Sequence, residues 1–192
     1  MAQDNIEVEI KTKIGKKKFE SLKLKLKRIS KFKDKIHHID TYYNSPTKNF
    51  LKPKYPYEWL SVRDRGEKLT LNYKHWYPPG KKNTTHCDEY EIVFDSIEQI
   101  EKILKALDFK KLITVDKTRW TFIHNNEIEI ALDEVKGLGY FIEVEALRNK
   151  GDLKQTYNNL EEFLKSLGIK DTTIIPGGYA AEMLRRKGLM KI

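Results

Sequence analysis

The chain has 192 residues, of which 39% are hydrophobic and 34% are charged, with a formal net charge of +9. This hydrophobic share excludes a disordered chain, and the positive charge favours an anionic partner such as phosphate, nucleic acid or a membrane surface. No apolar run approaches the roughly 20 residues of a membrane-spanning helix, and the N-terminal residues show no signal-peptide pattern. The single cysteine, Cys87, excludes an internal disulfide framework and predicts a cytoplasmic protein.

Short stretches of alternating apolar and polar residues predict β-strands along most of the chain. Turn signals such as Pro78-Pro79-Gly80 and Gly137-Leu138-Gly139 separate several of them. No repeat, low-complexity segment or long linker divides the chain, so we predict a single domain over residues 1–192. The predicted strands are residues 5–12, 38–44, 58–65, 68–76, 87–94, 115–123, 127–134 and 139–147.

Helical periodicity predicts four helices, the first of which is ambiguous. Phe19, Leu22 and Leu26 recur at helical spacing. Leu22, Leu24 and Leu26, however, also alternate with lysines as they would in a strand. We favour the helix. The predicted helices are residues 15–30, 96–108, 152–167 and 179–187.

The polar face of nearly every predicted strand carries long charged side chains in pairs. Glu7 and Glu9, for example, alternate with the apolar residues of the first strand. Eight such strands can close into a barrel whose apolar face lies outside under the helices and whose charged face lines the lumen. A solvated polar face is the simpler interpretation, but it gives no reason for paired charges on so many strands.

Acidic and basic side chains in one lumen favour a metal ion together with a phosphate chain. Confined carboxylates repel one another and need cations, and the hard cations Mg²⁺ and Mn²⁺ commonly keep substrate phosphates among their ligands. Arginine and lysine are suited to phosphoryl oxygens. A linear triphosphate would satisfy both sets at once. The basic set consists of Lys11, Arg63, Arg65, Lys74, Lys117 and Arg119.

Charged motifs follow one another along the chain in a fixed order. They are Glu7-Val8-Glu9-Ile10-Lys11, His38-Ile39-Asp40-Thr41-Tyr42-Tyr43, Arg63-Asp64-Arg65, Lys74, Glu89-Tyr90-Glu91, Lys117-Thr118-Arg119, Asp133 and Glu143-Val144-Glu145. In this order they resemble the CYTH superfamily, also called triphosphate tunnel metalloenzymes. The first motif matches the Glu-x-Glu-x-Lys signature of that superfamily, and the second is similar to its second strand.

The resemblance implies an α+β fold: an eight-stranded antiparallel β-barrel, or tunnel, with a charged lumen and helices packed outside. It implies that the basic set binds the triphosphate. The metal ligands that it implies are Glu7, Glu9, Asp133, Glu143 and Glu145. The lumen side chains that we consider as catalytic groups are Glu89, Glu91 and Lys74.

The favoured activity is hydrolysis of the terminal phosphate of tripolyphosphate, ATP or thiamine triphosphate with Mg²⁺ or Mn²⁺, because hydrolysis needs no pocket for a base. A class IV adenylyl cyclase is the alternative. Residues 178–184 resemble the Ser-Tyr-x-x-Leu-Leu region of that branch only loosely, with Gly178 in place of serine. A non-catalytic polyphosphate or nucleotide binder is a second alternative. By analogy with members that pair through barrel surfaces, we expect a homodimer.

Segment 16–35 carries ten lysine or arginine residues and admits two interpretations. It is either a patch for nucleic acid or another polyanion, or the solvated face of a helix. We favour the solvated face, and we therefore expect neither nucleic acid nor a membrane as a partner.

Overall fold

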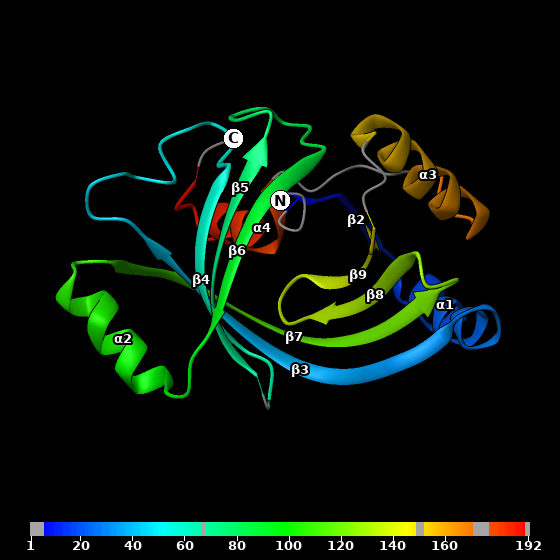
Figure 1. Ribbon diagram of the computed structural model, residues 1–192, viewed down its shortest axis with the longest axis horizontal. Helices are drawn as coiled ribbons and strands as arrows, with labels where there is room; N and C mark the ends of the chain where they lie inside the picture. Colours follow the sequence, from blue (N-terminus) through cyan, green and yellow to red (C-terminus); the bar gives the residue numbers. More distant parts are fainter. Residues whose placement is uncertain (1–5, 67, 149–151, 171–176, 191–192) are drawn as a thin grey trace.

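The computed structural model describes residues 6–66, 68–148, 152–170 and 177–190, and in them nine antiparallel strands form one nearly closed sheet with four helices around it (Figure 1). The strands follow one another in the sheet as β1-β6-β5-β4-β3-β7-β8-β9-β2. Their bounds are β1 Ile6–Glu7, β2 Glu9–Ile14, β3 Lys31–Asn44, β4 Glu58–Asp64, β5 Leu69–Tyr77, β6 His86–Val93, β7 Lys110–His124, β8 Ile128–Val135 and β9 Gly139–Ala146. The helices are α1 Lys16–Ile29, α2 Ile97–Ala106, α3 Leu153–Ser166 and α4 Gly178–Arg186.

The first predicted strand closes the barrel because it changes neighbours at Val8. On one side of Val8, Glu7 of β1 pairs with Cys87 of β6, and on the other side Glu9 of β2 pairs with Glu145 of β9. The antiparallel tunnel is therefore confirmed. Nine strands are present instead of eight because this one predicted strand is divided between two partners.

Two strands are longer than predicted. β3 begins at Lys31 and β7 at Lys110, and the two pair over almost their whole length. Exposed charged residues occupy the early part of β3, so the alternation of apolar and polar residues by which a strand is recognised is lost there. The pair forms the long curved base of the barrel in Figure 1.

Helices α1 and α3 cover the outer face of one half of the barrel. Phe19, Leu22 and Leu26 of α1 are buried, while Leu24 is exposed, so the predicted helix is confirmed over the strand alternative. These side chains pack in one cluster with α3 and with apolar residues of β2, β8 and β9. Within the described parts of the chain, no helix is long and apolar enough to cross a membrane.

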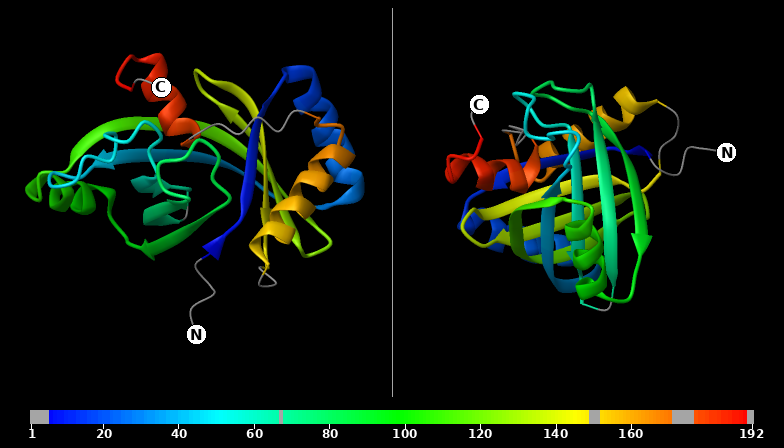
Figure 2. Two further views of the ribbon diagram at one scale, coloured as in Figure 1. Left: turned by 90° about the horizontal axis from the view of Figure 1, so that it is seen from above. Right: turned by 90° about the vertical axis from the view of Figure 1, so that its left-hand side faces the viewer.

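Helix α2 also packs on the outside, whereas α4 packs at one end of the barrel (Figure 2, α4 in red). Leu184 of α4 lies in a cluster with Trp59, Val115 and Phe141. These three strand residues lie on the lumen face of their strands. Phe141, for example, lies two positions before Glu143 and therefore shares its face. The lumen is thus charged along its middle and apolar under α4.

Candidate active site

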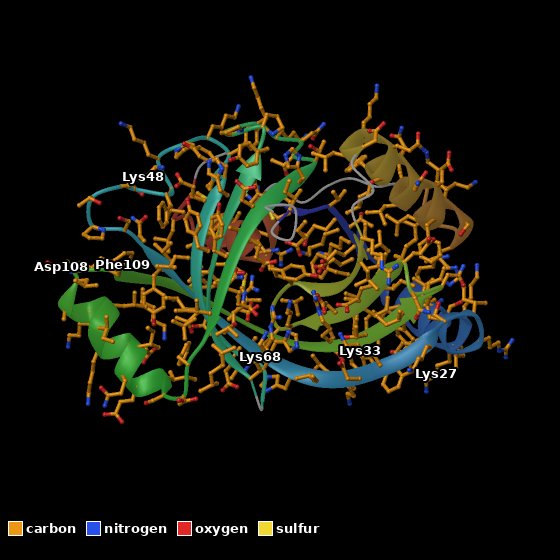
Figure 3. The ribbon with its side chains drawn as sticks, in the orientation of Figure 1. Lys27, Lys33, Lys48, Lys68, Asp108 and Phe109 are labelled. Atoms are coloured by element: carbon orange, nitrogen blue, oxygen red, sulfur yellow. The ribbon has the colours of Figure 1, made fainter. Side chains whose placement is uncertain are left out.

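A cavity of about 540 Å³ occupies the interior of the barrel, where side chains from the surrounding strands converge (Figure 3). It receives them because residues two apart on a strand share a face. All the predicted site residues line this cavity except Asp133, which lies beneath its surface with 0% exposure. The charged lumen is confirmed. Lys27, by contrast, lies on α1 at the end of the molecule opposite α2 (Figure 3) and is exposed.

Three of the five predicted metal ligands meet in one place. Glu7, Glu9 and Glu145 each offer a carboxylate oxygen, and these oxygens lie within 4.8 Å of one another. We call these residues the acidic trio. Lys74 forms an ion pair with Glu7, and its Nζ lies 3.6 Å from a carboxylate oxygen of Glu9. Oxygen ligands in such a cluster fit a hard divalent cation such as Mg²⁺ or Mn²⁺.

Burial and mutual repulsion raise the pKa of two members of the acidic trio, Glu7 and Glu145. Burial raises the pKa of Glu7 to about 7, with Glu9 and Glu89 adding to the effect and Lys74 opposing it. Burial and the Glu7 carboxylate likewise raise the pKa of Glu145 well above its usual range. A bound divalent cation would relieve this repulsion, because it favours the ionised form of every carboxylate around it.

We expect the stabilising effect of Mn²⁺ to grow between pH 6 and pH 8. Metal binding requires deprotonated carboxylates, and these become available as the pH rises through about 7, the pKa of Glu7. Without metal, the stability of the protein changes with pH in the opposite direction. The pKa of Glu7 is higher in the folded than in the unfolded state, so the stability due to protonated Glu7 is lost as the pH rises through the folded-state pKa. Unfolding temperatures with Mn²⁺ and with EDTA at the two pH values measure both effects. Equal Mn²⁺-induced shifts at pH 6 and pH 8 would contradict the expectation.

The other two predicted metal ligands, Asp133 and Glu143, contact basic side chains, and their role as metal ligands stays a prediction. Asp133 accepts hydrogen bonds from Arg119 at 2.8 and 2.7 Å and from the hydroxyl of Tyr179 at 2.8 Å. Glu143 accepts from Arg119 at 3.0 Å and pairs with Lys11 at 2.7 Å. Arg119 and Lys117 hold the pKa of Asp133 below its usual range, although burial opposes them. Both acids therefore fix the positions of cations that face the cavity.

The predicted catalytic groups are paired with one another and with Arg63. Arg63 donates from Nη1 to Glu89 at 3.0 Å and to Glu91 at 3.3 Å. Glu91 also accepts from Lys68 at 2.6 Å, and Glu89 lies 3.8 Å from Lys74. The pKa of Lys74 is raised well above its usual range, because Glu7 and Glu9 outweigh the effect of its burial. In this arrangement none of the three is a free base, and their catalytic role stays a prediction.

Four cations face the cavity from β4, the residue that follows it and β7, and we call them the basic wall: Arg63, Arg65, Lys117 and Arg119. Burial lowers the pKa of Lys117 to about 8, with Arg119 adding to the effect. The pKa of Arg65 is also lowered, by burial and by Arg63. The pKa of Arg63 and that of Arg119 are raised instead, because neighbouring carboxylates such as Asp40 and Asp133 outweigh the effect of burial. Lys117 and Arg65 are therefore the two cations of the basic wall whose charge a bound anion would stabilise.

Four buried side-chain polar atoms of the described residues have no hydrogen-bond partner. One is Nε1 of Trp59, and the other three lie in or beside the basic wall: Nδ1 of His38, Oδ1 of Asp40 and Nε of Arg65. His38 and Asp40 lie on the same face of β3, opposite Lys117 and Arg63 in the register. Buried polar groups are normally bonded, so unpaired donors and acceptors beside a cavity indicate where a ligand or water binds.

Sequence reasoning assigned no role to Asp40 or Tyr179. Asp40 is visible in the sequence as part of the second-strand motif, and its alternation with Tyr42 places it on the lumen face. Tyr179 lies in the C-terminal helix, and its ring contacts Lys11 and Lys117 at 4.8 and 5.2 Å from the ammonium groups to the ring centroid. No sequence pattern brings the start of α4 to the lumen, because that contact depends on the tertiary fold.

The fold and the lumen define a class of protein, the antiparallel β-barrels that hold acidic and basic side chains inside one tunnel. Within this class the chain belongs to the CYTH family, since the CYTH domain model matches residues 5–179. Members of this family are enzymes of the adenylyl cyclase-like and triphosphatase kinds. A single domain over residues 1–192 stays a prediction.

Individual relatives agree with this assignment. The chain is 31% identical over 176 residues to "Putative adenylate cyclase MJ0240" of Methanocaldococcus jannaschii, covering 91% of this chain and 96% of that protein. It is 28% identical to the PH1819 protein of Pyrococcus horikoshii, with a TM-score of 0.74 over 94% of this chain and 99% of that one. HpAC1 from Hippeastrum, an adenylyl cyclase by name described as having a dominant triphosphatase activity, shares the fold at 17% identity, with a TM-score of 0.63 over 97% of both chains.

Proposed function

We propose that this chain is a divalent-metal-dependent triphosphatase that hydrolyses the terminal phosphate of a triphosphate bound in the tunnel. The observation that carries the proposal is the division of one cavity into an acidic trio and a basic wall. A metal-bound phosphate chain is the small ligand whose charges match both parts. The description of HpAC1 supports hydrolysis, because it reports this activity in a protein of the same fold.

Different residues around the cavity would bind the metal and the phosphate chain. Glu7, Glu9 and Glu145 would hold the metal, which supplies charge neutralisation on phosphoryl oxygens when it is bound. The basic wall would bind the non-bridging oxygens and stabilise the charge that moves toward the leaving group. Asp133 and Glu143 would keep Arg119 in place for this purpose. Most of the catalysis would then come from positioning and electrostatics.

A class IV adenylyl cyclase is the second candidate. Two indole rings, those of Trp59 and Trp76, line the cavity at the end where α4 packs. Aromatic side chains at the end of a phosphate site offer stacking surfaces for a nucleobase. The 31% identity to MJ0240, which is named for this activity, supports the candidate.

A substrate panel distinguishes the candidates. Purified protein is incubated with Mg²⁺ or Mn²⁺ and with tripolyphosphate, ATP or thiamine triphosphate, and the products are separated by chromatography. We expect orthophosphate from at least one substrate. Cyclic AMP with pyrophosphate would establish the cyclase instead. Metal-dependent binding without any product would favour the non-catalytic binder.

Arg63→Ala tests the basic wall. We expect the KM for tripolyphosphate to rise about 10- to 100-fold, because charged hydrogen bonds typically contribute about 1.5–3 kcal/mol. Arg28→Ala is the matched control: Arg28 is exposed on α1, so the variant loses the same charge outside the tunnel. An equal rise in KM for both variants would mean that overall charge, and not a site, attracts the substrate.

Two further expectations stay predictions. A homodimer formed through barrel surfaces is tested by light scattering on the eluting protein, where a mass of twice 22.7 kDa would support it. A cytoplasmic location is tested by fractionation of the source cells.

A further inference from the structure

The Asp40 carboxylate occupies an unusual place for an acid. It is 3% exposed, it lines the cavity, and it lies among the cations of the basic wall and not within the acidic trio. Its Oδ2 atom is 3.9 Å from Nζ of Lys117, which is too long for a hydrogen bond, and its Oδ1 atom has no partner among the described residues. The titratable groups that act on it are Lys117, Arg63, Arg65, His38 and Tyr42.

The ionised form of this carboxylate is maintained by its neighbours. Lys117, Arg63 and Arg65 hold the pKa of Asp40 below its usual range, although burial opposes them. A buried carboxylate oxygen is an acceptor only, and here it has nothing to accept from. It would repel the phosphoryl oxygens that the basic wall binds. The ligand atom that suits it is one that carries a proton.

We propose that Asp40 is a catalytic residue that binds and orients the attacking water, accepting a hydrogen bond from it at Oδ1. This proposal rests on the proposed triphosphatase function and adds the nucleophile site to it. In the reaction, the water oxygen forms a bond to the terminal phosphorus while the bond from that phosphorus to the bridging oxygen breaks. The bridging oxygen leaves with the bonding electron pair, and one proton of the water passes to Asp40 and then to the orthophosphate product.

A low pKa does not disqualify Asp40 for this role. Phosphoryl transfer passes through a loose transition state in which the nucleophile is bonded only weakly, so its orientation matters more than a strong base. Orienting a nucleophile requires a fixed acceptor. Asp40 is held on the long strand β3, where it stands opposite Arg63 of β4 in the register of the sheet. Glu89 and Glu91, the carboxylates of β6 that line the cavity, already accept hydrogen bonds from Arg63.

Asp40→Asn is expected to change kcat and tripolyphosphate affinity in opposite directions. We expect kcat for tripolyphosphate with Mn²⁺ to fall about 100-fold or more, which is the usual contribution of a positioned acid or base. We also expect tripolyphosphate to bind several-fold more tightly, because a negative charge is removed from the basic wall. Calorimetry with tripolyphosphate in EDTA measures that affinity in the absence of metal. Asp116→Asn is the matched control, since Asp116 is outside the lumen and pairs with His37 at 2.7 Å.

Each other outcome overturns the inference. If Asp40→Asn retains kcat, Asp40 does not hold the nucleophile. If kcat and tripolyphosphate affinity fall together with the unfolding temperature, Asp40 merely supports the basic wall. Asp40→Glu provides the test if the Asn variant does not fold. This variant keeps the charge, so we expect unchanged tripolyphosphate affinity and a lowered kcat. An unchanged kcat would contradict the proposal. If the wild-type protein itself releases no orthophosphate, the proposed function fails and this inference fails with it.

Discussion

Glu9→Gln is expected to lower kcat for triphosphate hydrolysis by about a thousandfold or more, because a metal ion supplies several kcal/mol of transition-state stabilisation. Glu9 is 8% exposed and belongs to the acidic trio, so the substitution removes one anionic ligand with little change in shape. Mn²⁺ binding, measured by calorimetry, should weaken in the same variant. Agreement between the two measurements would assign the loss of turnover to the metal.

Glu9→Gln also affects the stability of the protein, and this effect has to be separated from the loss of metal binding. Glu9 also pairs with Lys11 at 3.1 Å, so the neutral side chain removes part of the charge that compensates a buried lysine. An unfolding temperature measured in EDTA reports this effect without metal. Glu98→Gln is the matched control, because Glu98 is exposed on α2. Full activity in Glu9→Gln would count against the acidic trio as the metal site.

Asp133→Asn is expected to lower the free energy of unfolding by about 3–5 kcal/mol, the usual loss when one partner of a buried ion pair is removed. Asp133 is fully buried and is the bidentate acceptor for Arg119, with Lys117 3.5 Å away. Without its charge, each of the two cations loses the nearest of its carboxylates, and only Glu143 beside Arg119 and Asp40 beside Lys117 remain. Urea unfolding of the metal-free protein measures the effect, and Asp116→Asn supplies an exposed control.

The same variant decides between two roles for Asp133. The family resemblance implies a metal ligand, whereas the structure surrounds the carboxylate with Arg119 and Tyr179. If Asp133 is a structural anion, Mn²⁺ affinity should change little in the fraction that is folded. If stability in EDTA is unchanged and Mn²⁺ affinity falls instead, Asp133 is a metal ligand and the arrangement seen here rearranges when metal binds.

Much of the fold was predictable because strand alternation is a local property. In β2, β6 and β9 two charged residues stand two positions apart, and this spacing alone places the two on one face. The pairs are Glu9 and Lys11, Glu89 and Glu91, and Glu143 and Glu145. The helix over residues 16–29 was also favoured correctly. The start of β3 was not predictable, since exposed charged residues on the long β3–β7 pair hide the alternation. The division of the first strand at Val8 depends on which strands lie beside it, and the local sequence does not identify these neighbours.

The sequence by itself determined which residues face the lumen, and therefore that acids and bases share one cavity. Only the tertiary structure decided which acids lie together and which pair with a base. Glu7, Glu9 and Glu145 converge, while Asp133 and Glu143 pair with Arg119. The reason is physical. Alternation fixes the face of a residue, but the partner of a charge depends on strand register and on side chains that come from distant segments, as Tyr179 does. For the same reason the unpaired oxygen of Asp40 is visible only once the barrel is closed.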